Sequence, residues 1–145
     1  MPPGATLSRT KERLMTKRVL ILDDNADNRK LLVYALMSGD YEIHQAELGS
    51  DVARLIQDTQ YDLALLDIEL PDGDGLELAE QMRERSPNAV VIMLSANDNI
   101  DRLEQARKVG AHAYVVKPFN LPKVLKFIQE YDTPPADSHV EMQVL

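Results

Sequence analysis

Short apolar runs alternate regularly with segments of helical periodicity along this sequence of 145 residues. The runs are rich in valine, isoleucine and leucine, and several are continuous, which is typical of parallel strands covered by helices on both faces. They occupy residues 18–22, 41–46, 61–66, 89–94 and 113–116. The alternation predicts an α/β fold in which a doubly wound, five-stranded parallel sheet carries five helices.

The segments between these runs carry signals for helix starts and ends. The first helix is predicted over 26–38, with Leu31, Leu32, Ala35 and Leu36 on its buried stripe and Gly39 as its C-cap. The later helices have side chains that can accept a backbone hydrogen bond at their starts. The predicted caps are Ser50, Asp74, Asn97 or Asp98, and Asn120, and Ile100, Leu103 and Ala106 are predicted to face inward.

Composition and charge exclude several classes of function. The formal net charge is -8 and the isoelectric point is about 4.8, which argues against direct nucleic-acid binding because that requires a basic face. The chain has no cysteine, so it offers neither a disulfide nor a thiolate metal site. No apolar run approaches the roughly 20 residues of a membrane helix, and the N-terminus lacks the apolar core of a signal peptide. We therefore expect a cytoplasmic protein.

The two ends of the chain differ from its middle. Residues 1–16 are predicted to be a flexible N-terminal extension, residues 17–131 the single folded domain, and residues 132–145 a flexible tail that follows Pro134 and Pro135. Within that tail, Val140, Met142 and Val144 alternate with polar residues. This alternation leaves open a short strand that could pair with the sheet edge of a partner.

Charged and polar side chains stand where four of the apolar runs end. They are Asp23, Asp24, Asp67, Ser95 and Lys117. Ligands of such folds bind at the carboxyl ends of the strands, so these side chains meet if their strands are neighbours. Clustered carboxylates need a cation, and hard oxygen donors favour Mg²⁺ or Mn²⁺. A lysine and a serine can hold phosphate oxygens and an aspartate can attack phosphorus, so the set predicts phosphoryl chemistry.

The same residues resemble the receiver domain of two-component response regulators. The resemblance covers about residues 17–131 and includes the loop Leu70–Gly75 and the segment Gly110–Phe119. It implies the flavodoxin-like, CheY-like (βα)5 fold with strand order 2-1-3-4-5. No output domain follows residue 131, so the resemblance implies a stand-alone regulator.

The resemblance also implies roles for the acidic residues. Asp67 would be the phospho-acceptor. Asp24 and Asp67 would ligate Mg²⁺ directly together with the backbone carbonyl of Glu69, and Asp23 would act mainly through water. The phosphoryl lifetime stays open, because the family tunes it through neighbours such as Glu69.

Three further residues receive roles from the resemblance. Ser95 and Lys117 would hold the phosphoryl oxygens, with a cis peptide bond from Lys117 to Pro118. Tyr114 would be an aromatic switch that moves inward as Ser95 moves toward the phosphate.

Partners follow from the family in the same way. The donor would be the phosphohistidine of a sensor histidine kinase or a histidine phosphotransfer protein. The fourth helix, fifth strand and fifth helix would form a face that binds a downstream protein or a second copy in a homodimer. The resemblance implies no enzyme beyond self-phosphorylation and autodephosphorylation.

Three rival functions compete with this interpretation. A haloacid-dehalogenase-type phosphatase would use Glu69 as its second acid, but it leaves Asp23 and Asp24 unexplained. A flavin-binding module would need a phosphate-cradling loop in the place of these two acids. The serious alternative is a receiver fold that acts as an interaction scaffold independently of phosphorylation.

Overall fold

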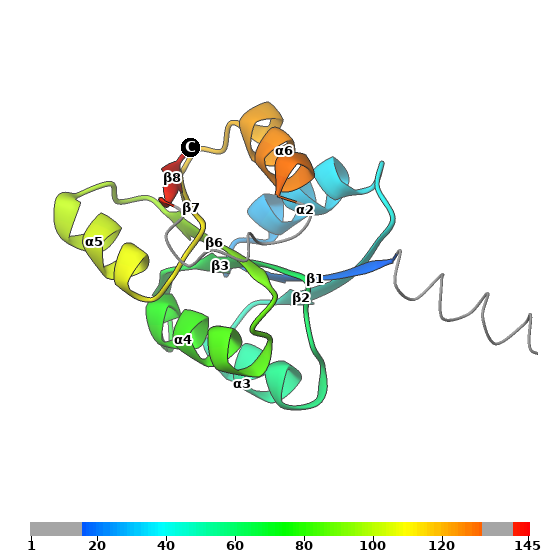
Figure 1. Cartoon of the computed structure of the whole chain (residues 1–145), viewed down its shortest axis with the longest axis horizontal. Coiled ribbons are helices and arrows are strands. Elements are labelled where there is room, and N and C mark those ends of the chain that lie inside the picture. Colours follow the sequence, from blue (N-terminus) through cyan, green and yellow to red (C-terminus); the bar gives the residue numbers. More distant parts are fainter. Residues whose placement is uncertain (1–15, 132–140) are drawn as a thin grey trace, which may run out of the picture.

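The sheet has the predicted strand order and one additional strand. The computed structural model describes residues 16–131 and 141–145, and their main sheet has the order β2-β1-β3-β6-β7-β8 (Figure 1). These strands are β2 (Tyr41–Ala46), β1 (Lys17–Leu22), β3 (Leu63–Asp67), β6 (Val90–Ser95), β7 (Ala113–Val116) and β8 (Gln143–Val144). Along the chain, β6 and β7 are the fourth and fifth strands of this sheet, so the first five strands have the order 2-1-3-4-5. These five are parallel, which confirms the doubly wound flavodoxin-like fold.

Helices cover both faces of the sheet, as Figure 1 shows. One core cluster joins the sheet to two helices, and the other joins the opposite face to three. The first pair is α2 (Ala26–Leu36) and α6 (Leu121–Glu130), and the second group is α3 (Gly49–Asp58), α4 (Gly75–Arg85) and α5 (Ile100–Lys108). Every residue of the central strands β3 and β6 is buried, which explains their continuous apolar sequences.

Two of the predicted helix caps are confirmed. The Asp74 side chain accepts a hydrogen bond from the backbone N–H of Leu76 at the start of α4, and Asn120 accepts one from Lys123 at the start of α6. Each bond satisfies an N–H that has no partner within its own helix.

The predicted caps of α3 and α5 are wrong. Ser50 lies inside α3, whose first N–H groups are satisfied from elsewhere: the Asp72 carboxylate accepts from Gly49 N at 2.9 Å and from Ser50 N at 3.1 Å. In α5 the cap is Asn99, which accepts from Arg102 N, rather than Asn97 or Asp98. Several adjacent residues could cap either helix, and tertiary packing selects among them.

The predicted buried stripes are also corrected in part. Leu31 is 46% exposed and Ile100 is 76% exposed, whereas Leu32 and Leu36 are buried. Residues four apart share a helix face, so Leu32 and Leu36 take the positions facing the sheet. The helix α2 ends at Leu36, before the predicted C-cap Gly39.

Residues 141–145, the described part of the tail, include a short strand where the sequence predicts a flexible segment. The strand β8 extends the sheet along the free edge of β7 in the same chain. Met142 is 8% exposed, and burial of such a side chain favours docking. The predictions for residues 1–15 and 132–140 lie outside the described residues. No helix among the described residues is long and apolar enough to cross a membrane.

Candidate functional site

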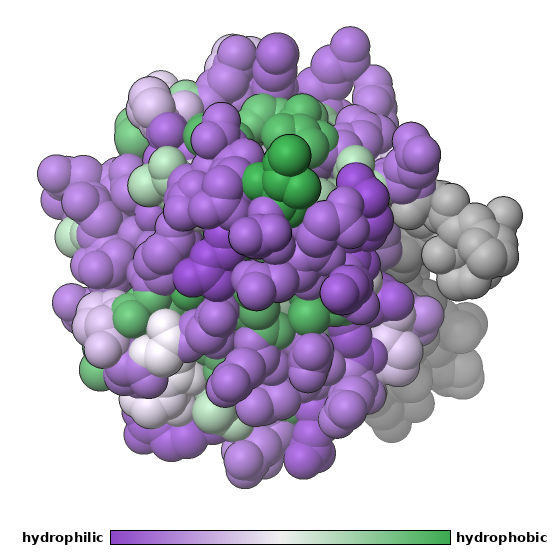
Figure 2. Space-filling view, turned by 90° about the vertical axis from the view of Figure 1, so that its left-hand side faces the viewer, coloured by the Kyte–Doolittle hydropathy of each residue, from purple (hydrophilic) through white to green (hydrophobic). Residues whose placement is uncertain are grey.

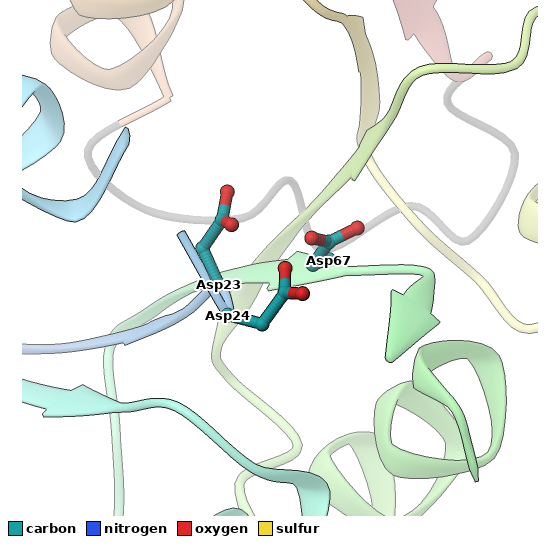
Figure 3. A group of neighbouring side chains, drawn as sticks. All are labelled: Asp23, Asp24 and Asp67. Carbon is teal, nitrogen blue, oxygen red and sulfur yellow. The ribbon is translucent and has the colours of Figure 1, made fainter. Parts of the chain in front are cut away.

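Three carboxylates meet at the carboxyl ends of two neighbouring strands. Because β1 pairs directly with β3, with Leu22 opposite Leu66, the residues that follow Leu22 and Leu66 lie side by side. One carboxylate oxygen from each of Asp23, Asp24 and Asp67 lies within 4.8 Å of the others. Figure 3 shows the three side chains pointing into one region above the strand ends. The structure thus brings together the predicted acidic cluster.

Lys117 supplies the counter-charge from the end of β7. Its Nζ donates a hydrogen bond to Asp67 Oδ2 at 2.8 Å and forms an ion pair with Asp23 Oδ2 at 3.0 Å. The predicted cis peptide bond between Lys117 and Pro118 is confirmed. Lys117 therefore bridges the two buried carboxylates, which would otherwise repel each other.

Burial and neighbouring charges shift the pKa values of Asp67 and Lys117. Burial raises the pKa of Asp67 from 3.8 to about 6, although the hydrogen bond and charge of Lys117 act in the opposite direction. Asp23 and Glu69 add to the increase through their negative charge. For Lys117, burial alone lowers the pKa, but hydrogen bonds and charge from Asp67 and Asp23 outweigh it and raise the pKa.

The acidic cluster fits a hard divalent cation. All of its side-chain donors are carboxylate oxygens, which Mg²⁺ and Mn²⁺ prefer. Asp23 Oδ2 is fully buried, and its contact is the ion pair with the Lys117 ammonium 3.0 Å away, so this oxygen retains capacity for a further ligand. Asp24 is exposed, which gives a hydrated ion access to the cluster.

Ser95 lies beside the acidic cluster, but its hydroxyl is hydrogen-bonded to Glu69. The Ser95 hydroxyl donates to Glu69 Oε1 at 2.6 Å and lies 3.1 Å from the carbonyl oxygen of Asn97, while the N–H of Asn97 donates back to Ser95 Oγ at 3.0 Å. From the sequence, Glu69 is expected to contribute a backbone carbonyl to the cation site and to tune the phosphoryl lifetime, but not to contact Ser95. Its position two residues after Asp67 was the available signal, but the contact between the side chains of Glu69 and Ser95 requires the fold.

Tyr114 is the second residue of β7, and its side chain is fully buried. Its hydroxyl donates to the backbone carbonyl of Asn97, the residue that also contacts Ser95. Burial raises the pKa of the Tyr114 hydroxyl, so it remains a donor at neutral pH. The ring therefore occupies an inward position, hydrogen-bonded to the loop that follows Ser95.

A close approach of two backbone segments holds Asp67 in place. The loop after β3 forms a small hairpin of β4 (Glu69–Leu70) and β5 (Gly73–Asp74), and Gly75 N then donates to Ile68 O at 2.8 Å. A Cβ atom on Gly75 would lie 1.9 Å from the carbonyl oxygen of Asp67. Only glycine lets α4 begin this close to the end of β3.

A Gly75→Ala substitution is therefore expected to destabilise the fold by about 3 kcal/mol, because the clash is with backbone and must displace Asp67 or α4. Urea unfolding measures the loss. Glu77→Ala, an exposed change in the same helical turn, is the control and should cost less than about 0.5 kcal/mol. Equal stability of the two variants would contradict the close approach.

Comparison with known proteins identifies the family. A model of the response regulator receiver domain family matches residues 19–129. The chain belongs to this family. Its receiver is 32% identical over 112 residues to the regulatory protein AtoC of Escherichia coli, and 32% identical over 111 residues to the transcriptional regulatory protein SrrA of Staphylococcus aureus. Each match covers 77% of this chain but only 24% of AtoC and 46% of SrrA. The chain thus spans less than half the length of these relatives.

Solved receivers have the same fold. A CheY-like receiver domain protein from Methanospirillum hungatei is 31% identical with a TM-score of 0.74, and the match covers 79% of this chain and 92% of that one. The response regulator TrrA of Thermotoga maritima, solved in complex with Mg²⁺ and beryllofluoride, is 34% identical with a TM-score of 0.69. That match covers 79% of this chain and 97% of TrrA.

Proposed function

We propose that this receiver accepts a phosphoryl group on Asp67 from a phosphohistidine, in a reaction that requires Mg²⁺ or Mn²⁺. The observation that carries this proposal is the buried Asp67 carboxylate, held 2.8 Å from the Lys117 ammonium within a cluster of two further acids. One oxygen of Asp67 forms the new O–P bond while the N–P bond of the donor breaks, and the imidazole leaves with the electron pair.

The surrounding residues stabilise charge on the transferred group. Asp23, Asp24 and Asp67, with the backbone carbonyl of Glu69, would hold the cation, which neutralises charge on the phosphoryl oxygens when bound. Lys117 is placed to exchange its contact with an Asp67 oxygen for one with a phosphoryl oxygen. Ser95 would leave Glu69 to donate to a second phosphoryl oxygen, and Tyr114 would respond through Asn97.

The phosphohistidine donor is a protein, and α2 offers a surface for it. Leu31, Tyr34 and Met37 are 46%, 76% and 70% exposed, respectively, and they recur every third residue along the helix and its C-cap. Apolar side chains in such a row are typical of a docking surface. Because α2 begins two residues after Asp24, a kinase or phosphotransfer protein bound there would sit beside the site.

The fourth helix, fifth strand and fifth helix of the receiver are α5, β7 and α6. The output is a change in protein contacts on the face that they form, where a downstream protein or a second copy would bind. We propose no turnover of a separate substrate. Autodephosphorylation by water would return the receiver to its initial state.

Incubation of the whole chain with acetyl phosphate and Mg²⁺ tests the proposal. We expect intact-mass spectrometry to show the gain of one phosphoryl group, and ¹⁹F NMR to show Mg²⁺-dependent binding of beryllofluoride. Chelation of the metal should abolish both signals. A chain that neither gains mass nor binds beryllofluoride would instead be the phosphorylation-independent scaffold.

A further inference from the structure

The C-terminal strand β8 is tied to β7 by backbone hydrogen bonds. Gln143 N donates to His112 O at 3.1 Å and Leu145 N donates to Tyr114 O at 2.7 Å, while Val116 N donates to Leu145 O at 3.1 Å. These bonds satisfy polar groups of β7 and of His112, the residue before it, that would otherwise form an open sheet edge. The terminal segment Glu141–Leu145 therefore occupies a position suited to strand addition.

Side chains of this segment are seated on both faces of the sheet. Met142 is 8% exposed and belongs to the same core cluster as Tyr114. Leu145 packs against the opposite cluster, and Gln143 Nε2 donates to the Tyr131 hydroxyl at 2.7 Å. The edge thus accommodates two apolar side chains, Met142 and Leu145, that are three residues apart. These side-chain contacts fix the position of the segment more specifically than backbone pairing alone would.

The segment lies on the face proposed for output. Figure 1 shows β8 beyond β7, between α5 and α6. Figure 2 looks at the side of the molecule that carries α5, where apolar patches are set among hydrophilic surface. The exposed large apolar side chains of α5 and β8 are Ile100 and Val144, which are 76% and 56% exposed. A partner that bound the β7 edge would meet β8 first.

We propose that Glu141–Leu145 is an intramolecular ligand of the α5–β7–α6 face, and that a partner protein binds there by displacing it. Such a partner would add an extended segment to the β7 edge, with apolar side chains at the spacing of Met142 and Leu145. A strand of two residues is among the least stable elements of a fold, so exchange with a partner strand is feasible. The role as competitor rests on the proposed output face, whereas the docking of the segment does not.

Hydrogen exchange in the full-length chain tests the docking. Met142→Asp places a charge in the buried position, so we expect the Val116 amide to exchange about tenfold faster or more than in the wild type. Val144→Asp, which adds the same charge at an exposed position, is the matched control and should leave Val116 protected. Amides of β6 should keep their protection in both variants. If Met142→Asp fails to fold, Leu145→Asp repeats the test.

Unchanged exchange at Val116 in the Met142→Asp chain would overturn the proposal. Loss of Val116 protection on dilution of the wild type would also overturn it, because the strand would then come from a second copy. Neither measurement needs metal or a phosphoryl donor. Failure of this inference is therefore distinguishable from failure of Asp67 to accept a phosphoryl group.

Competition is measured with a fluorescein-labelled peptide of residues 138–145. We expect the full-length Met142→Asp chain to bind this peptide about tenfold more tightly or better than the wild type or Val144→Asp, because its own segment no longer fills the edge. A peptide that itself carries aspartate in place of Met142 should not bind. Equal affinity of the wild type and Met142→Asp for the peptide, or no binding to either, would refute the self-competition.

Discussion

Replacement of Asp67 by asparagine is expected to lower phosphoryl incorporation by about 1,000-fold or more, to below detection, while the fold is retained. The amide has the shape of the carboxylate but lacks the nucleophilic oxygen that forms the O–P bond. The fold does not require the charge, because burial raises the pKa of Asp67 to about 6 and so favours the uncharged side chain. Mass spectrometry after incubation with acetyl phosphate and Mg²⁺ measures the loss, and circular dichroism checks the fold.

Asp58→Asn is the control for this variant, because it makes the same chemical change at an exposed residue of α3. It should be phosphorylated at the rate of the wild type. Labelling of Asp67→Asn at that same rate would place the acceptor at another residue and remove the basis of the proposed function. Labelling in neither the wild type nor Asp58→Asn would favour the scaffold.

The acidic site was predictable because the ends of the strands can be recognised in the sequence. Continuous apolar runs end at Leu22 and Leu66, and an acid follows each run directly. Parallel strands that are neighbours in a sheet bring such residues together without any further information. The structure adds the distances and the Lys117 bridge between Asp23 and Asp67, which sequence spacing does not contain.

The predictions that were wrong concern helix caps and buried helix positions, where several neighbouring residues are chemically suited to the same role. Ser50 is a good cap by type, but the Asp72 carboxylate reaches the same N–H groups from a loop 22 residues away. Ile100 is apolar, yet in α5 the fully buried position belongs to Ala106. Such outcomes follow from how helices pack on the sheet, and a single sequence does not determine that packing.

Two long-range contacts could not be predicted for a related reason. The bond between Glu69 and Ser95 joins the first residue of β4 to the last residue of β6, and it depends on the side-chain rotamers of both residues. The alternation around Met142 indicated a strand but did not specify its partner. That choice depends on the free edge of β7 and on the apolar surface beside it.

Lys117→Met is expected to destabilise the metal-free receiver by about 3–5 kcal/mol at pH 8, the range for removal of one partner from a buried ion pair. The loss arises because Lys117 is the cation that contacts both Asp23 and Asp67, whose side chains are 0% and 3% exposed. Methionine keeps much of the side-chain volume but leaves these two carboxylates facing each other. Their repulsion then opposes folding.

The pH dependence of this loss has a definite sign. In the wild type, the folded-state pKa of Asp67 is about 6 and thus above its ordinary value of 3.8, so the folded state binds the proton more tightly than the unfolded state. Stability therefore falls as pH rises from about 4 to 6, by about 3 kcal/mol for a shift of this size. Without Lys117 the pKa of Asp67 rises further, and the decline extends to higher pH. Most of the lost stability should return at pH 5, where Asp67 is protonated.

Thermal and urea unfolding at pH 5 and pH 8, with and without Mg²⁺, measure these effects. Millimolar Mg²⁺ at pH 8 should stabilise Lys117→Met more than the wild type, because the ion replaces the missing positive charge beside Asp67. Lys123→Met, at an exposed position of α6, is the control and should change stability by less than about 0.5 kcal/mol at either pH. If Lys117→Met lost the same stability at pH 5 and pH 8, packing rather than charge would explain the loss. Since the lysine and the cation neutralise the same carboxylates, the fold would be held by Lys117 when the metal is absent and by both when it is bound.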